Sequence, residues 1–165
     1  MRNPMFPAMA TLERRDRIAV VRNAIRFPVL GVLLLYAYVP LVQSAGRLGP
    51  IITAPPGPWA GIAGGVGCFL GMIAYAAVPA LRAGVRPNAR LADLHFFTAA
   101  LACVGVFVGL FLAGADAIYV TDPDRLRPIV GFVRLRSVSG WVLSATALLP
   151  PAAIFLSKRR RQDPA

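Results

Sequence analysis

The sequence predicts an all-α integral membrane protein, a bundle of four membrane-spanning helices with both termini in the cytoplasm. Four apolar stretches, each about 20 residues long, match the length that a helix needs to cross the hydrocarbon core of a bilayer. None of them contains Asp, Glu, Lys or Arg, and one such charge at the centre of a span costs about 2.5 to 3.5 kcal/mol. Lys and Arg gather in alternate connections between the stretches, which is typical of a protein inserted with a fixed orientation.

The chain is interpreted as one transmembrane domain, residues 27–157, between basic tails at residues 1–26 and 158–165. The predicted spans cover residues 27–45, 59–81, 94–115 and 138–157. A cleaved signal peptide is the alternative for the first span. The apolar run is longer than the stretch of about 7 to 15 residues found in signal peptides, which favours a membrane-spanning helix.

Thirteen of the 18 Lys and Arg residues lie in the two tails and in the connection between the second and third spans. The positive-inside rule therefore places both termini in the cytoplasm, and we expect the protein in the bacterial cytoplasmic membrane. Trp59 and Trp141 then fall near the outer ends of the second and fourth spans, where indole rings prefer to lie. The net charge of +11 predicts contact with anionic lipid head groups and not with nucleic acid, because the basic residues flank apolar spans.

The connections differ in composition. Residues 46–58 contain four prolines and are expected to be extended. Residues 116–137 mix three Asp with four Arg and are predicted to form a polar loop, with a turn or helix start at residues 121–124. Pro150 and Pro151 are expected to interrupt and bend the fourth span, because proline removes backbone donors.

Small residues recur at three- and four-residue steps in the second span and share one helical face. They are Gly61, Gly64, Gly65, Cys68 and Gly71, and the third span repeats the spacing at Gly105 and Gly109. Such residues let helix backbones approach closely in a bilayer, where apolar burial gives no driving force between helices. Two uses remain open, packing within the chain and an interface with another membrane subunit.

The residues needed for most membrane chemistry are missing. One His is too few for a haem with two axial histidines, and Cys68 and Cys103 lie in different spans and are expected to be packing residues. All seven acidic residues lie outside the spans or at their ends, so no carboxylate is placed to couple cation and proton binding. The sequence predicts no catalytic residue, no metal site and no cofactor bound by this chain alone. A membrane enzyme acting from residues 116–137 would lack a nucleophile and base pair.

His95 is the remaining candidate for chemistry. It lies at the start of the third span, just after Asp93. Asp93 is expected to cap that helix, and its negative charge suits the positive N-terminal end of the helix dipole. Two interpretations stay open for His95: a structural or interfacial residue, and a proton relay or quinone contact together with Asp93.

Residues 59–157 resemble the last three helices of the main subunit of haem-copper oxidases, the cytochrome c oxidase subunit I family. The most specific part, Arg90–Phe97, is similar to the Leu-x-x-Leu/Ile-His-Phe-Trp start of the family's penultimate helix. Weaker similarity lies at residues 75–81, 111–114, 122–124 and 137–141. The family's haem-binding histidines are replaced here by residues 58–61, and its propionate-binding arginines by residues 115–117. The resemblance thus implies a shared scaffold without the catalytic residues.

This resemblance implies a non-catalytic accessory or assembly subunit of a larger membrane complex, of the respiratory, haem-copper oxidase type. Its expected partners are the lipid bilayer and other integral membrane subunits, with the glycine faces as the docking surface. The alternative is an independent small transporter or channel-like protein, for which proline-bent spans and glycine seams are equally suitable.

Overall fold

The computed structural model describes residues 14–43, 57–82, 85, 88–119 and 126–159. These residues form four helical segments and no strand. The first segment is α2 (Arg14–Gln43), and the second joins α4 (Gly57–Met72), the π-helix η1 (Ile73–Ala77) and α5 (Val78–Leu81). The third is α6 (Ala89–Tyr119), and the fourth joins α7 (Leu126–Thr146) and α8 (Leu149–Arg159). Each segment is long and apolar enough to cross a membrane, which confirms the expected all-α fold with four helices of membrane-spanning length.

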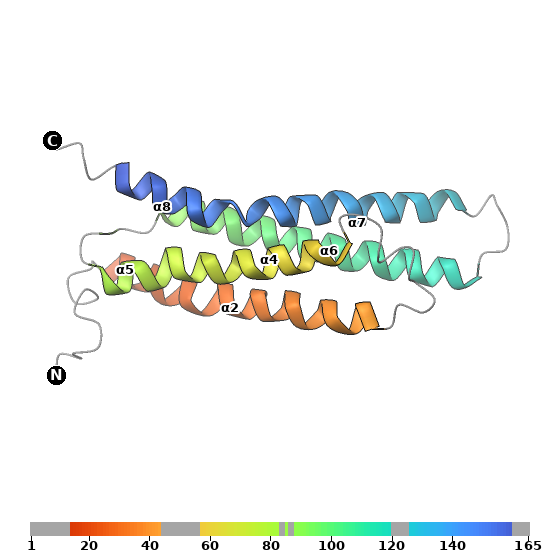
Figure 1. The fold of residues 1–165 in the computed structure, drawn as a ribbon, viewed down its shortest axis with the longest axis horizontal. Coiled ribbons are helices and arrows are strands. Elements are labelled where there is room, and N and C mark those ends of the chain that lie inside the picture. The colour runs from red at the N-terminus through yellow and green to blue at the C-terminus, as the bar shows by residue number, and fades with distance from the viewer. Residues whose placement is uncertain (1–13, 44–56, 83–84, 86–87, 120–125, 160–165) are drawn as a thin grey trace.

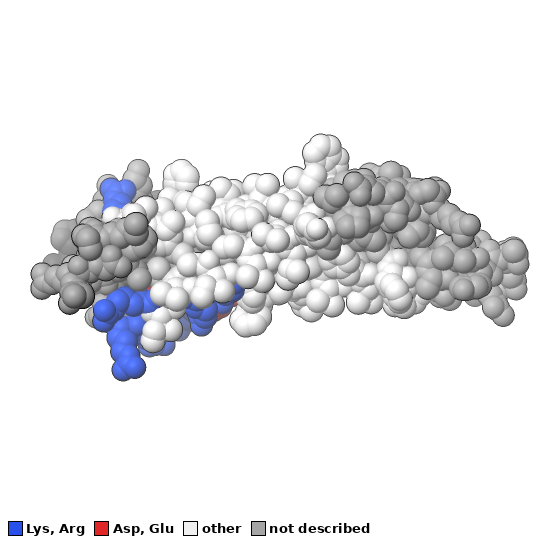
Figure 2. Space-filling view, turned by 90° about the horizontal axis from the view of Figure 1, so that it is seen from below, with Lys and Arg blue, Asp and Glu red and all other residues white. Residues whose placement is uncertain are grey.

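The four segments lie side by side in a bundle (Figure 1). The start of α2, the end of α5, the start of α6 and the end of α8 meet at one end of it, which we call the basic end. On the face drawn in Figure 2, the described Lys and Arg side chains gather at this end, and most of the remaining described surface is uncharged. Every segment turns large apolar side chains outward, among them Val29, Leu70, Leu101 and Val142. Such an outer surface suits contact with lipid.

Helix α2 starts earlier than expected. The sequence places residues 14–26 in the basic tail, but they form a helix that is continuous with the first span. Its buried positions include Val20, Asn23, Phe27, Leu30 and Leu34. Their steps of three and four residues keep one face of the helix against the bundle on both sides of the predicted boundary. The tail is therefore part of the packed fold from Arg14 onward.

The predicted polar loop at residues 116–137 is wrong for most of its length. Helix α6 continues to Tyr119 and α7 begins at Leu126; residues 121–124 lie outside the described part. The extra turns belong to a helical hairpin, and α6 and α7 extend beyond α2 and α4 at the end opposite the basic end (Figure 1). The two helices pack closely near the base of this hairpin. A Cβ atom on Gly109 of α6 would lie 2.8 Å from the carbonyl oxygen of Phe132 on α7.

Proline residues set the irregular parts of the second and fourth segments. The expected interruption of the fourth span is confirmed, because α7 ends at Thr146 and α8 begins at Leu149. In between, the amide of Leu148 donates to the carbonyl of Ala145, 3.1 Å away, a three-residue bond that tightens the chain before Pro150. In the second segment, Pro79 has no amide to donate to the carbonyl of Tyr75, four residues earlier. The π-helix η1 lies at this position.

Candidate functional site

The glycines singled out in the sequence bring the helices of this chain together. A Cβ atom on Gly64 would lie 2.5 Å from Cγ of Leu143 on α7, and one on Gly65 would lie 2.7 Å from Cγ of Leu35 on α2. Both distances are shorter than real Cβ contacts, so a larger residue at either position would have to displace the leucine side chain that faces it. The glycine face of α4 therefore packs inside the bundle, and these two positions are not a docking surface for another subunit.

The other small residues follow the same pattern. Gly71 faces His95 and Phe27, Gly105 faces Ser139, and Gly109 faces Arg136 and Phe132. Gly61 and Cys68 are buried, and Cys68 and Cys103 are free thiols in the core, as expected of packing residues. Of the two uses left open by the sequence, the structure assigns packing within the chain to Gly64, Gly65, Gly71, Gly105 and Gly109.

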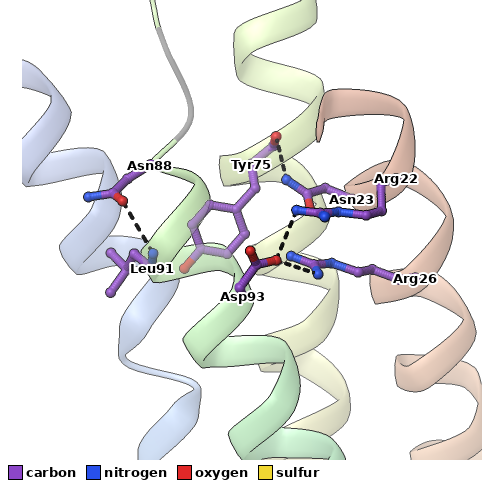
Figure 3. Close-up of polar contacts among 7 residues, drawn as sticks. All are labelled: Arg22, Asn23, Arg26, Tyr75, Asn88, Leu91 and Asp93. Carbon is purple, nitrogen blue, oxygen red and sulfur yellow. Dashed lines mark hydrogen bonds and ion pairs between the residues drawn. The ribbon is translucent and has the colours of Figure 1, made fainter. Parts of the chain in front are cut away.

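The structure gathers polar side chains at the basic end, in a site that we call the His95 cluster. It consists of Arg22, Asn23 and Arg26 on α2, Tyr75 on η1, and Asp93 and His95 on α6. In Figure 3, Arg22 and Arg26 reach from α2 toward Asp93, and Asn23 reaches toward Tyr75. Three helical segments that are distant in sequence therefore converge on one site.

Asp93 is the acidic group of this cluster. Its Oδ1 atom accepts hydrogen bonds from Nη2 of Arg22 at 2.9 Å and from Nη1 of Arg26 at 2.7 Å. The predicted role of Asp93 as a helix cap is wrong, because α6 begins at Ala89 and the side chain of Asn88 accepts the amide of Leu91 at 3.2 Å. Asp93 lies in the second turn, where its side chain points across to α2.

Arg26 lies in a largely apolar setting. Its guanidinium carbon is 4.8 Å from the ring centroid of Phe96 and 5.2 Å from that of Phe27, distances at which a cation is attracted to an aromatic face. Its side chain is 12% exposed, whereas those of Arg22 and Asp93 are 49% and 37% exposed. The ion pair thus runs from the surface of the basic end into the bundle.

His95 is fully buried in an aromatic cage. Its ring centroid is 5.0 Å from that of Phe27 and 5.9 Å from that of Tyr75. A Cβ atom on Gly71 would lie 3.0 Å from Cε1 of His95, so the imidazole packs tightly against the backbone of the second segment. Asn23 supports the cage, because its Nδ2 donates to the carbonyl of Tyr75 at 3.3 Å. This carbonyl is the one that Pro79 leaves without its usual helical donor.

Several polar atoms of the cluster are buried and make no hydrogen bond within the described chain. They are Oδ1 of Asn23, Nε and Nη2 of Arg26, the hydroxyl of Tyr75, and both ring nitrogens of His95. A buried polar atom left in this state costs about 1 to 3 kcal/mol. Four residues with such atoms therefore lie together in the His95 cluster.

The sequence pointed to His95 and Asp93 but missed Arg22, Asn23, Arg26 and Tyr75. The helical spacing could have pointed to two of them. Asn23 lies on the same helix face as the buried residues Phe27, Leu30 and Leu34, and Arg26 is next to Phe27 in the sequence. No group of three or more His, Cys, Asp or Glu side chains placed to hold a metal ion occurs among the described residues. Comparison of the chain with protein-family models, with curated proteins and with solved structures gives no match.

Proposed function

We propose that this protein is a non-catalytic accessory or assembly subunit of a larger integral membrane complex. The observation that supports this role is the apolar character of the bundle core beyond the His95 cluster. The residues buried there include Leu34, Cys68, Ala99, Ala102 and Leu143, and the glycine contacts bring the helices together around them. Arg136 and Thr146 are the other polar side chains buried in the described part of the chain, so this core offers a crossing solute few polar groups and suits a subunit that stabilises neighbouring helices.

The proposed orientation places the basic end in the cytoplasm of a bacterial cell. It follows from the charge on the tails and on the start of α2, which favours the cytoplasmic side. Trp59 and Trp141 are exposed in the other half of the bundle, since Trp59 lies at the start of α4 and Trp141 lies two residues before Leu143, which faces Gly64. A reporter fused after Ala165 is expected to be cytoplasmic and one inserted at residues 121–127 external. A C-terminus found outside would reverse the assignment.

The candidate partner is a respiratory complex of the haem-copper oxidase type. The reason is the resemblance of residues 59–157 to the last helices of the oxidase main subunit, together with the absence of that subunit's ligands from the sequence. In such an assembly the chain would contribute scaffold helices and no redox centre. The outward apolar side chains, such as Phe97 and Phe111, would supply the contact area.

The experiment is extraction of the tagged protein from its native membrane in mild detergent, followed by native mass measurement and identification of bound chains by mass spectrometry. We expect stoichiometric recovery of other integral membrane subunits, with respiratory subunits among them. A tagged membrane protein of similar size, expressed and extracted in the same way, controls for chains that adhere to any apolar surface. Recovery of this chain alone, as a monomer or homo-oligomer, would contradict the proposal.

The second candidate is an independent small transporter or channel-like protein. The observation in its favour is the His95 cluster, because buried ionisable side chains in membrane helices often mark ion or proton pathways. The two functions predict different behaviour in purified form. A transporter would move its solute or protons across vesicles that contain this chain alone, and an accessory subunit would not.

A further inference from the structure

We propose that the His95 cluster is a hydrated inlet, open at the basic end and closed toward the middle of the bundle, through which His95 exchanges protons with water. The ligand of the site is water, and the group that it serves is the chain's single histidine. This inference does not depend on the accessory role proposed above.

The chemistry of the unpartnered atoms selects water. Nε and Nη2 of Arg26 only donate hydrogen bonds, and Oδ1 of Asn23 only accepts them. A neutral imidazole such as that of His95 needs one donor and one acceptor as neighbours, and the hydroxyl of Tyr75 can serve as either. An anion could satisfy the donors but not Oδ1 of Asn23. Water both donates and accepts, and a buried water molecule typically makes about three such bonds to polar groups that otherwise lack partners.

The exposure of the charged side chains defines the direction of the inlet. Arg22 and Asp93 are partly exposed, Arg26 is mostly buried, and Tyr75 and His95 are 1% and 0% exposed. Asp93 pairs with Arg26, and the ring of Phe27 lies against both the Arg26 guanidinium and the imidazole of His95, so Arg26 connects the partly exposed carboxylate to the buried ring. Polar groups therefore lead inward from the surface of the basic end to the ring of His95.

The inlet ends at His95. Phe27, the residue after Arg26 on α2, packs on the imidazole ring, and Gly71 lies close to Cε1 of His95. The neighbouring buried residues Leu30, Leu34 and Cys68 are apolar. Water that reaches His95 must therefore leave by the way it came. In the exchange, an imidazole nitrogen takes a proton from hydronium, leaving water, and later returns that proton to water.

The charged and titratable side chains around His95 come from two helical segments besides its own. Arg22 and Arg26 on α2 face Asp93 on α6, and Tyr75 on η1 lies against the imidazole. The positive charge of Arg26 opposes a positive charge on His95.

The test is water-edited solid-state NMR of the full chain in lipid bilayers. The protein carries a tag without histidine and is labelled with ¹⁵N at His and ¹³C at Cys, so that His95 reports on the cluster. Cys68 and Cys103, both buried in the apolar core, serve as the dry reference in the same sample. We expect magnetisation from water to reach the imidazole nitrogens at mixing times at which the cysteine signals are still weak.

A matched pair of variants separates the inlet from a general effect on the bundle. Tyr75→Phe removes a hydroxyl that faces the proposed water and should reduce the transfer from water to His95. Tyr36→Phe makes the same change at an exposed position of α2 and should leave the transfer unchanged. Imidazole nitrogens as dry as the cysteines would overturn the proposal. So would magnetisation that reaches them from lipid or from a co-purified organic molecule in place of water.

Discussion

Replacing Gly67 with alanine tests the close approach of the second and fourth segments. A Cβ atom on Gly67 would lie 2.7 Å from Cα of Ala147 and 2.9 Å from its Cβ, whereas ordinary contact begins at 3.4 Å. The nearest atom belongs to the backbone of the neighbouring segment, so no side-chain rotation relieves the overlap. The two segments must separate locally by about 0.7 Å, and overpacking of this kind costs about 1 to 3 kcal/mol. We therefore expect Gly67→Ala to lower the free energy of unfolding by that amount.

The matched control is Gly131→Ala on α7. Nothing lies within 4 Å of a Cβ atom built at Gly131, so alanine adds no overlap there and raises helix propensity by about 0.5 to 1 kcal/mol. Unfolding of both variants in mild detergent, titrated with a denaturing detergent and followed by fluorescence of the two Trp residues, gives the free energies. If Gly67→Ala were as stable as the parent while Gly131→Ala gained stability, the close contact between Gly67 and Ala147 would be refuted.

Two further predictions concern the basic end. Asp93→Asn leaves Arg26 without its carboxylate in a mostly buried position, and we expect a loss of about 1 to 3 kcal/mol in the same unfolding assay. Arg22→Gln, which removes only the exposed partner, should cost less than about 1 kcal/mol; equal losses would contradict the assigned burial. Asn88→Ala removes the side chain that accepts the amide of Leu91. This change should cost about 1 kcal/mol, with faster hydrogen exchange at Leu91 but not at the middle of α6.

The number and order of the membrane helices could be predicted from the sequence because the relevant signal is local. An uncharged apolar run about as long as the bilayer core is thick has few alternatives to a spanning helix. The glycine spacing was informative for a similar reason, since it fixed a face of α4 before any partner was known. It could not tell whether that face meets Leu143 and Leu35 of the same chain or a second protein, because this depends on which helices become neighbours.

Helix ends are harder to predict, because charge in the sequence does not mark where a helix stops. Arginines at the start of α2 and of α7 make residues 14–26 and 126–137 resemble a tail and a loop. In both segments the helix continues; on α7, Arg134 points to solvent and Arg136 packs between helices against Gly109. Long side chains of this kind can cover apolar surface with their methylene groups. A charged residue in an amphipathic pattern therefore bears on where the membrane-spanning part ends, whereas the helix itself can continue past that residue.

The His95 cluster shows why counting basic residues describes this protein incompletely. Arg22 and Arg26 belong to the set that predicts a cytoplasmic N-terminus, and in that role any arginine on this side would serve. In the fold they share one carboxylate, and Arg26 packs against the rings of Phe27 and Phe96. An arginine over an aromatic ring gains about 0.5 to 2 kcal/mol, which helps to offset its removal from water. Membrane topology requires only the positive charge, whereas the cluster requires the arginine side chains themselves at positions 22 and 26. Replacing Arg22 and Arg26 with Lys should therefore preserve the orientation but still disturb the site around His95.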